Sequence, residues 1–426
     1  MRPTRPVAAG LAAALAVSIL TVAPSANADT SPATTTAPAG TFSDASRDVD
    51  RLLEGRIAAA ATDDAAAIPQ ELTSLAGTEA TPTVSVCPAG AATCIRRAPD
   101  DTSGGASVAA AGWPKVCSAN QYDTTPKWLG ITRRAACFHD KANFTIYKVG
   151  SGEVTGTFTA HMGLTAEAVA GGAGWNTTGY LALWRFTGNG KVTWTTASIL
   201  ALPSGKAKGG ITSWGASGGF VWKGSGWVSA PTMASKAVVN GVGGAWEVTM
   251  GNPEWDNVAI WPLDRFKGRC DRYYSTPGCV FPTVPGVATF SKATAPQYAK
   301  HVSGAIKSGL PGKFGSSSYI SRITSKPSTA KNRAKACPSS LKRPSGYSCD
   351  EYPFASTRQG AYTSGATRAR SQPWCRMKDP ARTGSKGWSR CFITKTQNSI
   401  GGGYLSGFYR YERMLTGDKF QVGFIA

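Results

Sequence analysis

The chain has 426 residues and a formal net charge of +21, with 46 Lys and Arg against 25 Asp and Glu. This length leaves room for two domains, and the charge points to a polyanionic partner: nucleic acid, an anionic membrane or an acidic wall polymer. Beyond the first residues, no segment reaches about 18 continuous apolar residues, which argues against a transmembrane helix.

The first 28 residues predict a secretory signal peptide. Arg2 and Arg5 precede an apolar run over residues 7–20, and Ala26-Asn27-Ala28 forms a small-residue cleavage site. We therefore expect residues 1–28 to be removed and the mature protein to be secreted and extracellular. No stable membrane association is expected after signal cleavage.

The next two regions differ in composition. Residues 29–110 are rich in Ala, Thr and Pro, carry 5 basic against 11 acidic residues, and predict a flexible leader or a propeptide. Residues 111–290 contain short β-branched and aromatic runs that alternate with period two, such as "VTGTFTAHM" and "KVTWTTASIL". This pattern predicts an all-β, sandwich-like domain in which the tryptophans pack in the core or on a sheet face.

The chain contains 10 cysteines, and in an exported protein an even number favours disulfides. A zinc site is disfavoured because no C-x-x-C occurs and there are only 3 histidines. The cysteines fall in neighbouring pairs, which favours sequential pairing, although spacing alone does not establish connectivity. The predicted pairs are Cys87–Cys94, Cys117–Cys137, Cys270–Cys279, Cys337–Cys349 and Cys375–Cys391.

Residues 292–426 hold most of the positive charge, with 23 Lys and Arg against 5 Asp and Glu, a net +18. A helix is predicted near Tyr298–Ile306, with His301 on its surface or in its packing. Residues 313–347 are Lys- and Ser-rich and are expected to form a loop. Strands are predicted around Tyr352 and at "RCFITK", then a helix over "QNSIGGGYLSGFYRYERML" and a final strand at "DKFQVGFIA".

Two adjacent carboxylates, Asp350 and Glu351, lie within this basic region and are the candidate catalytic residues. A strand with an acidic pair, a second strand and a helix with an amide near its start is typical of a one-metal nuclease site. Asp350 would deprotonate a water, while Asn398 would offer a hard oxygen to Mg or Mn. The surrounding cations would contact DNA phosphates; we assign this role to Arg358, Arg368, Arg370 and Lys395.

At these residues the sequence resembles the NucA/NucB-type secreted deoxyribonucleases. "CDEYPFAST" (349–357) resembles the hallmark of that family, and "QNSIGGGYLSGFY" (397–409) is similar to its Asn-containing helix. "NRAKAC" (332–337) and "RMLTGDKFQV" (413–422) also look like family positions. The resemblance covers about 292–426 and implies an α+β, compact ββα-metal-like nuclease domain that cleaves DNA with a divalent metal. It also implies that an acidic residue replaces the usual histidine base.

Two departures from the family pattern affect the expected metal site. Gln397 stands where the family has an acidic residue, and Gln359-Gly360-Ala361 replaces a Glu-Gly-Gly turn. A neutral amide at Gln397 can still be a ligand but carries no charge, so metal affinity should fall. The leading hypothesis is a secreted, monomeric, metal-dependent DNA endonuclease. The alternatives are a catalytically weakened extracellular DNA-binding module, a nuclease toxin effector, and a wall-binding protein.

Overall fold

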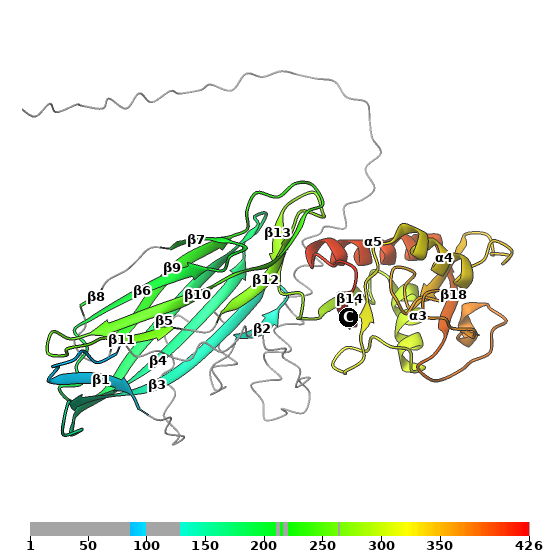
Figure 1. The fold of residues 1–426 in the computed structure, drawn as a ribbon. Helices are drawn as coiled ribbons and strands as arrows, with labels where there is room; N and C mark the ends of the chain where they lie inside the picture. The colour runs from blue at the N-terminus through cyan, green and yellow to red at the C-terminus, as the bar shows by residue number, and fades with distance from the viewer. Residues whose placement is uncertain (1–85, 99–127, 210–213, 216–219, 263–264, 426) are drawn as a thin grey trace, which may run out of the picture. The chain divides into compact units, whose positions relative to one another are not determined.

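The computed structural model describes residues 86–98, 128–209, 214–215, 220–262 and 265–425 (Figure 1). All of these residues belong to one compact unit, residues 41–426. Within the described residues, no helix is long and apolar enough to cross a membrane. The predicted signal peptide and most of the predicted leader lie outside the described residues.

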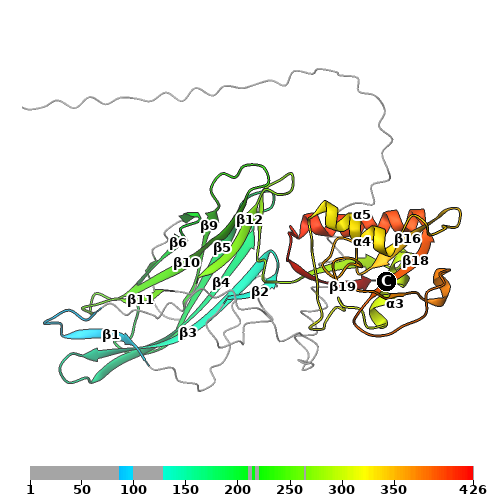
Figure 2. The same cartoon turned by 45° about the vertical axis from the view of Figure 1, so that its right-hand side comes forward.

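The expected all-β region consists of two sheets that share one hydrophobic core (Figures 1 and 2). Phe138 and Leu164 contribute from the first sheet, and Trp246 and Phe266 from the second. The predicted role of tryptophan in packing is confirmed for Trp128, Trp175 and Trp246, which are fully buried. The first sheet contains β1 (Thr93–Arg97), β2 (Trp128–Thr132), β3 (Ala135–Lys148), β4 (Val154–Ala168), β5 (Gly174–Gly188), β7 (Lys206–Gly209) and β9 (Phe220–Ser229). The second contains β6 (Trp194–Ala201), β8 (Trp214–Gly215), β10 (Val238–Gly251), β11 (Ala259–Pro262), β12 (Phe266–Asp271) and β13 (Gly278–Val280).

Strand β1 corrects the predicted extent of the leader. It lies within 29–110, yet it pairs antiparallel with β3 and buries Ile95 in the sandwich core. The Asn257 side chain holds it further, because its Oδ1 accepts from Ile95 N at 2.7 Å. A Thr-Cys-Ile run followed by two Arg residues is too short to indicate a strand without its distant partner.

The C-terminal region mixes helices and strands, as expected, but begins before residue 292. Strand β14 pairs in parallel with the last strand, β19, and buries Ala288 and Phe290 in the C-terminal core. Residues 286–291 are therefore part of the C-terminal core. The remaining elements are β14 (Gly286–Ser291), α3 (Pro296–Lys307), β15 (Ile320–Ser321), α4 (Lys326–Ala336), β16 (Tyr347–Tyr352), β17 (Ala369–Arg370), η2 (Pro373–Cys375), β18 (Trp388–Thr394), α5 (Lys395–Tyr411) and β19 (Lys419–Ile425).

Helix α4 replaces part of the loop predicted for residues 313–347. Its start is stabilised by Ser325, whose side chain caps the helix by accepting from Ser328 N at 3.3 Å. The helix has almost no apolar face, since its only buried residues are Asn332 and Ala336. A periodicity search misses such a helix because tertiary contacts at these two positions, rather than a hydrophobic stripe, fix it in place.

Close packing explains the first glycine of the "GGG" run in α5. A Cβ on Gly401 would lie 2.3 Å from the Tyr298 ring of α3, whereas Gly402 and Gly403 face open space. Gly401 therefore lets α5 approach α3 closely. The start of α5 directly follows β18, in the sheet that carries the acidic pair.

Four of the predicted disulfides are confirmed: Cys87–Cys94, Cys270–Cys279, Cys337–Cys349 and Cys375–Cys391. The fifth prediction, Cys117–Cys137, includes residue 117, which lies outside the described residues. The last two bonds anchor opposite faces of the sheet β16–β18–β17, because Cys349 packs with Phe392 on one face and Cys391 packs with Ile393 on the other.

Asp418, just before β19, is the centre of a network of buried charges. Its carboxylate accepts hydrogen bonds from Arg133 at 2.7 Å and from Arg269 at 2.8 Å. Leu415 N adds a third donor at 3.0 Å. Nearby, Arg413 donates to Asp271 at 2.6 Å. Each of these charged side chains has at least one partner of opposite charge, which is what a buried ionic network needs to be tolerated.

Candidate active site

Strand β16 places the acidic pair on opposite faces of its sheet, because successive side chains of a strand alternate. Asp350 lies opposite Cys391 in the register and faces α3, whereas Glu351 lies opposite Arg390 and faces α4. Because they lie on opposite faces of the sheet, the two carboxylates do not bind the same water or the same metal ion, although their charges interact.

Asp350 forms a chain of hydrogen bonds with His301 of α3 and Ser389 of β18. Its Oδ2 lies 2.6 Å from His301 Nδ1, and His301 Nε2 lies 2.9 Å from Ser389 Oγ. All three side chains are buried, with exposed fractions of 5%, 0% and 1%. An ionised carboxylate only accepts, so His301 Nδ1 is the donor to Asp350, and His301 Nε2 pairs with the serine hydroxyl.

Only one oxygen of Asp350 is used in this way. Among the described residues, none donates a hydrogen bond to Oδ1, while Oδ2 is held by the imidazole. The backbone carbonyl of His301 is also fixed, since Gln372 Nε2 donates to it at 2.9 Å. The arrangement gives Asp350 a defined orientation and leaves one oxygen to accept a proton.

Glu351 has a different environment on the other face. The guanidinium of its cross-strand neighbour, Arg390, is already paired with Asp379 at 2.6 Å. Burial raises the pKa of Glu351 to about 8, the charge of Asp350 adds to this shift, and Arg333 and the Ala355 N–H oppose it. Glu351 is therefore mostly protonated at neutral pH and is not a second anion of the site.

Helix α5 brings its two amide side chains to different places. Asn398 Nδ2 donates to Ser348 Oγ at 2.9 Å, next to Asp350 on the same strand face. Gln397 instead turns toward the start of α3, where its Oε1 accepts from Gln297 N at 3.1 Å and its Nε2 donates to Thr294 O at 3.4 Å. Asn398 thus lies beside the acidic pair, and Gln397 acts as a cap for α3.

The oxygen donors present are compatible with a loosely held hard cation. Asn398 Oδ1 accepts no hydrogen bond from the described residues, and an amide oxygen is a hard ligand suited to Mg²⁺, with the carboxylate of Asp350 close by. The described residues contain no cluster of three or more His, Cys, Asp or Glu that would enclose a metal. The donor set fits a cation that keeps several waters, and Gln397 does not contribute to it in this arrangement.

The four cations assigned to DNA have different exposures. Arg358, Arg368 and Lys395 are exposed. Arg370 is buried, and its guanidinium donates to Ser308 O at 3.0 Å and to Gly384 O at 2.9 Å. The three exposed cations are available to a polyanion, whereas the N–H donors of Arg370 bind backbone carbonyls within the protein.

His301 and Ser389 are the residues of this site that sequence patterns did not identify. His301 contacts Asp350 although the two are 49 positions apart in the sequence, and Ser389 joins them through His301. One signal was available: His301 falls on the same helical face as Tyr298 and Val302, so it must be buried when they are. A buried imidazole requires polar partners, and a buried acidic strand residue is a suitable one.

Residues 316–423 match a family model described as deoxyribonuclease NucA/NucB. A search of curated proteins and a search of solved structures found no match to this chain. The matched segment contains β16, β18 and α5, while α3 with His301 precedes it. The resemblance carried by the hallmark "CDEYPFAST" is thereby confirmed, and the C-terminal part of this chain carries a domain of the NucA/NucB deoxyribonuclease family.

Proposed function

We propose that this protein is a secreted endonuclease that hydrolyses DNA phosphodiester bonds, with Asp350 as the general base. The observation that carries the proposal is the orientation of Asp350, which holds one oxygen on His301 and leaves the other without a hydrogen bond from the described residues. The family match to residues 316–423 supports DNA as the substrate.

In the proposed reaction Asp350 Oδ1 takes a proton from a water molecule. The water oxygen bonds to phosphorus, the bond from phosphorus to the leaving oxygen breaks, and that oxygen takes a proton from solvent. His301 keeps the carboxylate in place by donating from Nδ1, and Ser389 keeps the imidazole in the required tautomer. The elements follow one another as strand, strand and helix (β16, β18, α5), which is the order expected for a ββα-metal-like site.

Mg or Mn is the proposed cofactor, held by Asn398 with Asp350 nearby. When bound, such a cation would stabilise the charge on the scissile phosphate and on the leaving oxygen. Since Gln397 supplies no negative charge and is used in capping α3, we expect weak metal affinity.

The remaining parts of the proposal concern location and state. Four disulfides in the described residues suit an oxidising, extracellular environment. DNA is the proposed partner, and the nuclease site is built from one chain, which is consistent with a monomer.

The test is plasmid digestion by the oxidised mature protein, with Mg²⁺, with Mn²⁺ and with EDTA. We expect nicking and linearisation only when a divalent metal is present. Asp350→Asn keeps the shape and a hydrogen-bond acceptor for His301 but removes the base, so cleavage should fall by about 10²–10⁴-fold. DNA affinity, measured in EDTA, should stay the same or rise slightly because a negative charge is lost.

Equal cleavage by the parent and by Asp350→Asn would show that the base is misassigned. A parent protein that binds DNA but cuts it under none of these conditions would instead favour the DNA-binding module.

A further inference from the structure

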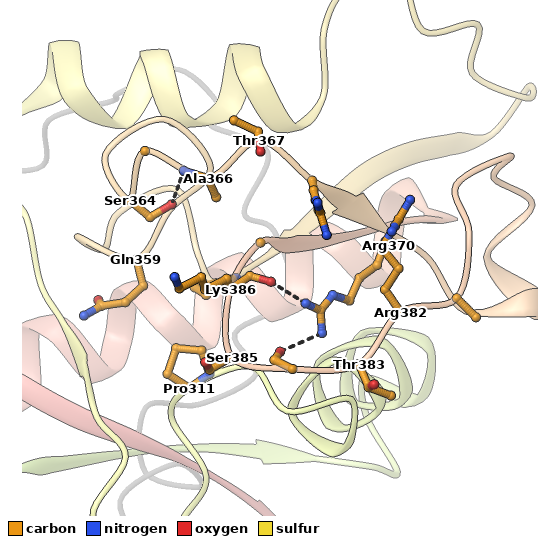
Figure 3. A pocket seen from close by; sticks show the side chains of 16 residues that line it. Pro311, Gln359, Ser364, Ala366, Thr367, Arg370, Arg382, Thr383, Ser385 and Lys386 are labelled. Carbon is orange, nitrogen blue, oxygen red and sulfur yellow. Dashed lines mark hydrogen bonds between the residues drawn. The ribbon is translucent and has the colours of Figure 1, made fainter.

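A large basic groove is lined by the loop over residues 381–387 and by residues 364–368 (Figure 3). It has a volume of about 1130 Å³, which exceeds the 300–1,000 Å³ typical of small-molecule sites and suits an extended ligand. Its lining contains four cationic side chains and no Asp or Glu. The cations are Arg368, Arg370, Arg382 and Lys386.

The groove has a defined wall because Arg370 organises the loop that forms it. From its buried position, Arg370 donates to the carbonyl of Gly384 and, through a short contact, to that of Lys386 (Figure 3). Its bonds to Ser308 connect the same loop to the end of α3. Gly384 N adds a bond to Ser308 O at 2.7 Å. The loop is exposed, but these hydrogen bonds fix its backbone conformation.

The charges in the groove are available to a ligand. Arg368, Arg382 and Lys386 are exposed, and none of them forms an ion pair with the part of the chain that the structure describes. Hydroxyls of Thr367, Thr383 and Ser385 line the same space. Cations and hydroxyls together are the groups that contact phosphate and sugar in protein–DNA complexes.

One lining residue of the groove lies close in the sequence to the proposed base. Pro353 lines it, and this residue follows β16 three positions after Asp350. At about 3.3 Å per residue this corresponds to about 10 Å along the strand, or about three nucleotide steps of a DNA strand. A strand bound at Asp350 can therefore continue into the groove.

We propose that this groove binds the sugar–phosphate backbone of DNA next to the scissile bond, through Arg368, Arg382 and Lys386. This inference rests on the proposed function and adds to it the surface that holds the substrate. Arg370 acts as a positioning residue beneath the groove, since its donors are used by loop carbonyls.

The test measures DNA binding by the full mature chain in EDTA, using the fluorescence anisotropy of a labelled 30-base-pair duplex over a range of salt concentrations. The double variant Arg382→Ala/Lys386→Ala should bind about 10–30-fold more weakly near 0.15 M salt. The slope of log Kd against log salt should fall by about 1.8, as expected for two lost phosphate contacts. The matched control is Lys342→Ala/Lys378→Ala, which removes the same charge from exposed positions outside the groove.

A control variant that loses as much affinity as the groove variant would overturn the proposal, since net charge alone would then explain binding. Tighter binding of a poly(glycerol phosphate) than of the duplex would also overturn it and assign the groove to a wall polymer. Binding in EDTA does not depend on cleavage. A parent protein that binds through the groove but does not cut DNA would therefore contradict the proposed function and leave the groove in place.

Discussion

Each face of the sheet β16–β18–β17 carries one acidic side chain and one disulfide bond, but the two acidic side chains have different environments. On the face covered by α3, Asp350 is held by His301, His301 is held in turn by Ser389, and the nearby bond Cys375–Cys391 connects η2 to β18. On the face covered by α4, Glu351 has no ion pair within the described residues, and its Oε2 lies 3.7 Å from Cys337 Sγ of the Cys337–Cys349 bond.

The difference shows how environment assigns roles to adjacent carboxylates. Asp350 accepts a hydrogen bond from His301, whereas the pKa of the half-buried Glu351 is raised to about 8 by desolvation and, to a smaller extent, by the charge of Asp350. A base must be ionised and oriented, so only the α3 face meets both conditions. The α4 face is left with a structural role, and each of the following changes tests this division.

The two disulfides should give the clearest separation. Replacing either Cys337 and Cys349 or Cys375 and Cys391 by Ala should lower the free energy of unfolding by about 2–4 kcal/mol, measured by denaturant titration. Only loss of Cys375–Cys391 should also reduce cleavage per folded molecule, because η2 follows Gln372, which fixes the His301 carbonyl. If loss of either disulfide bond reduced cleavage per folded molecule equally, the division of roles between the two faces would be contradicted.

His301 offers a test on the α3 face alone. His301→Gln should lower kcat by about 10–100-fold, the usual range when a group that orients a functional ligand is lost. KM and DNA affinity should stay within about threefold because the residue is buried away from the groove. Ser389→Ala should have a smaller effect in the same direction, and both variants should change the pH profile of kcat. A merely structural His301 would lower stability without moving that profile.

Several of these elements were predictable from the sequence because their signals are local. Helices α3 and α5 follow apolar periodicity, β19 alternates Phe420, Val422 and Phe424, and neighbouring cysteines pair in sequence. Asp350 was identified by composition, as an acid in a basic region. The opposite orientation of Glu351 also follows from strand alternation, although the adjacency of the two acids first suggests a joint role.

The features that could not be predicted from the sequence depend on contacts between distant segments. Helix α4 is held by Asn332, whose side chain donates to Ala355 O at 2.7 Å and accepts from Tyr362 N at 2.8 Å. The partner of Asp350, His301, comes from α3, and the partner of His301, Ser389, comes from β18. Arg370 is buried because it binds carbonyls of the loop that contains Gly384 and Lys386, and no local sequence pattern predicts the conformation of that loop.

The raised pKa of Glu351 should make the stability of the protein depend on pH. Its pKa is 4.5 in the unfolded chain and about 8 in the folded protein, so the folded state binds more protons between these values. Stability therefore falls as pH rises from about 5 to 8 and levels off above that. Glu351→Gln removes this loss and should be more stable than the parent at pH 8 by about 1–2 kcal/mol, discounted for its partial exposure, with little difference at pH 4.5. A difference that does not vary with pH in thermal melts would contradict the raised pKa.

The smallest expected effect belongs to Gln397→Glu on the α3 face. The family has an acidic residue here, and a metal ligand would predict tighter Mg²⁺ or Mn²⁺ binding. In this structure the side chain accepts from Gln297 N in the first turn of α3, a helix whose N-cap residue Ala295 forms no side-chain cap. A carboxylate there would interact favourably with the helix dipole but would lose the bond to Thr294 O, for a net change of about 0.3–1 kcal/mol. Metal titration of cleavage decides between the two roles. An unchanged half-saturating metal concentration supports the cap, whereas a severalfold decrease would show that residue 397 turns toward the metal when it carries a charge.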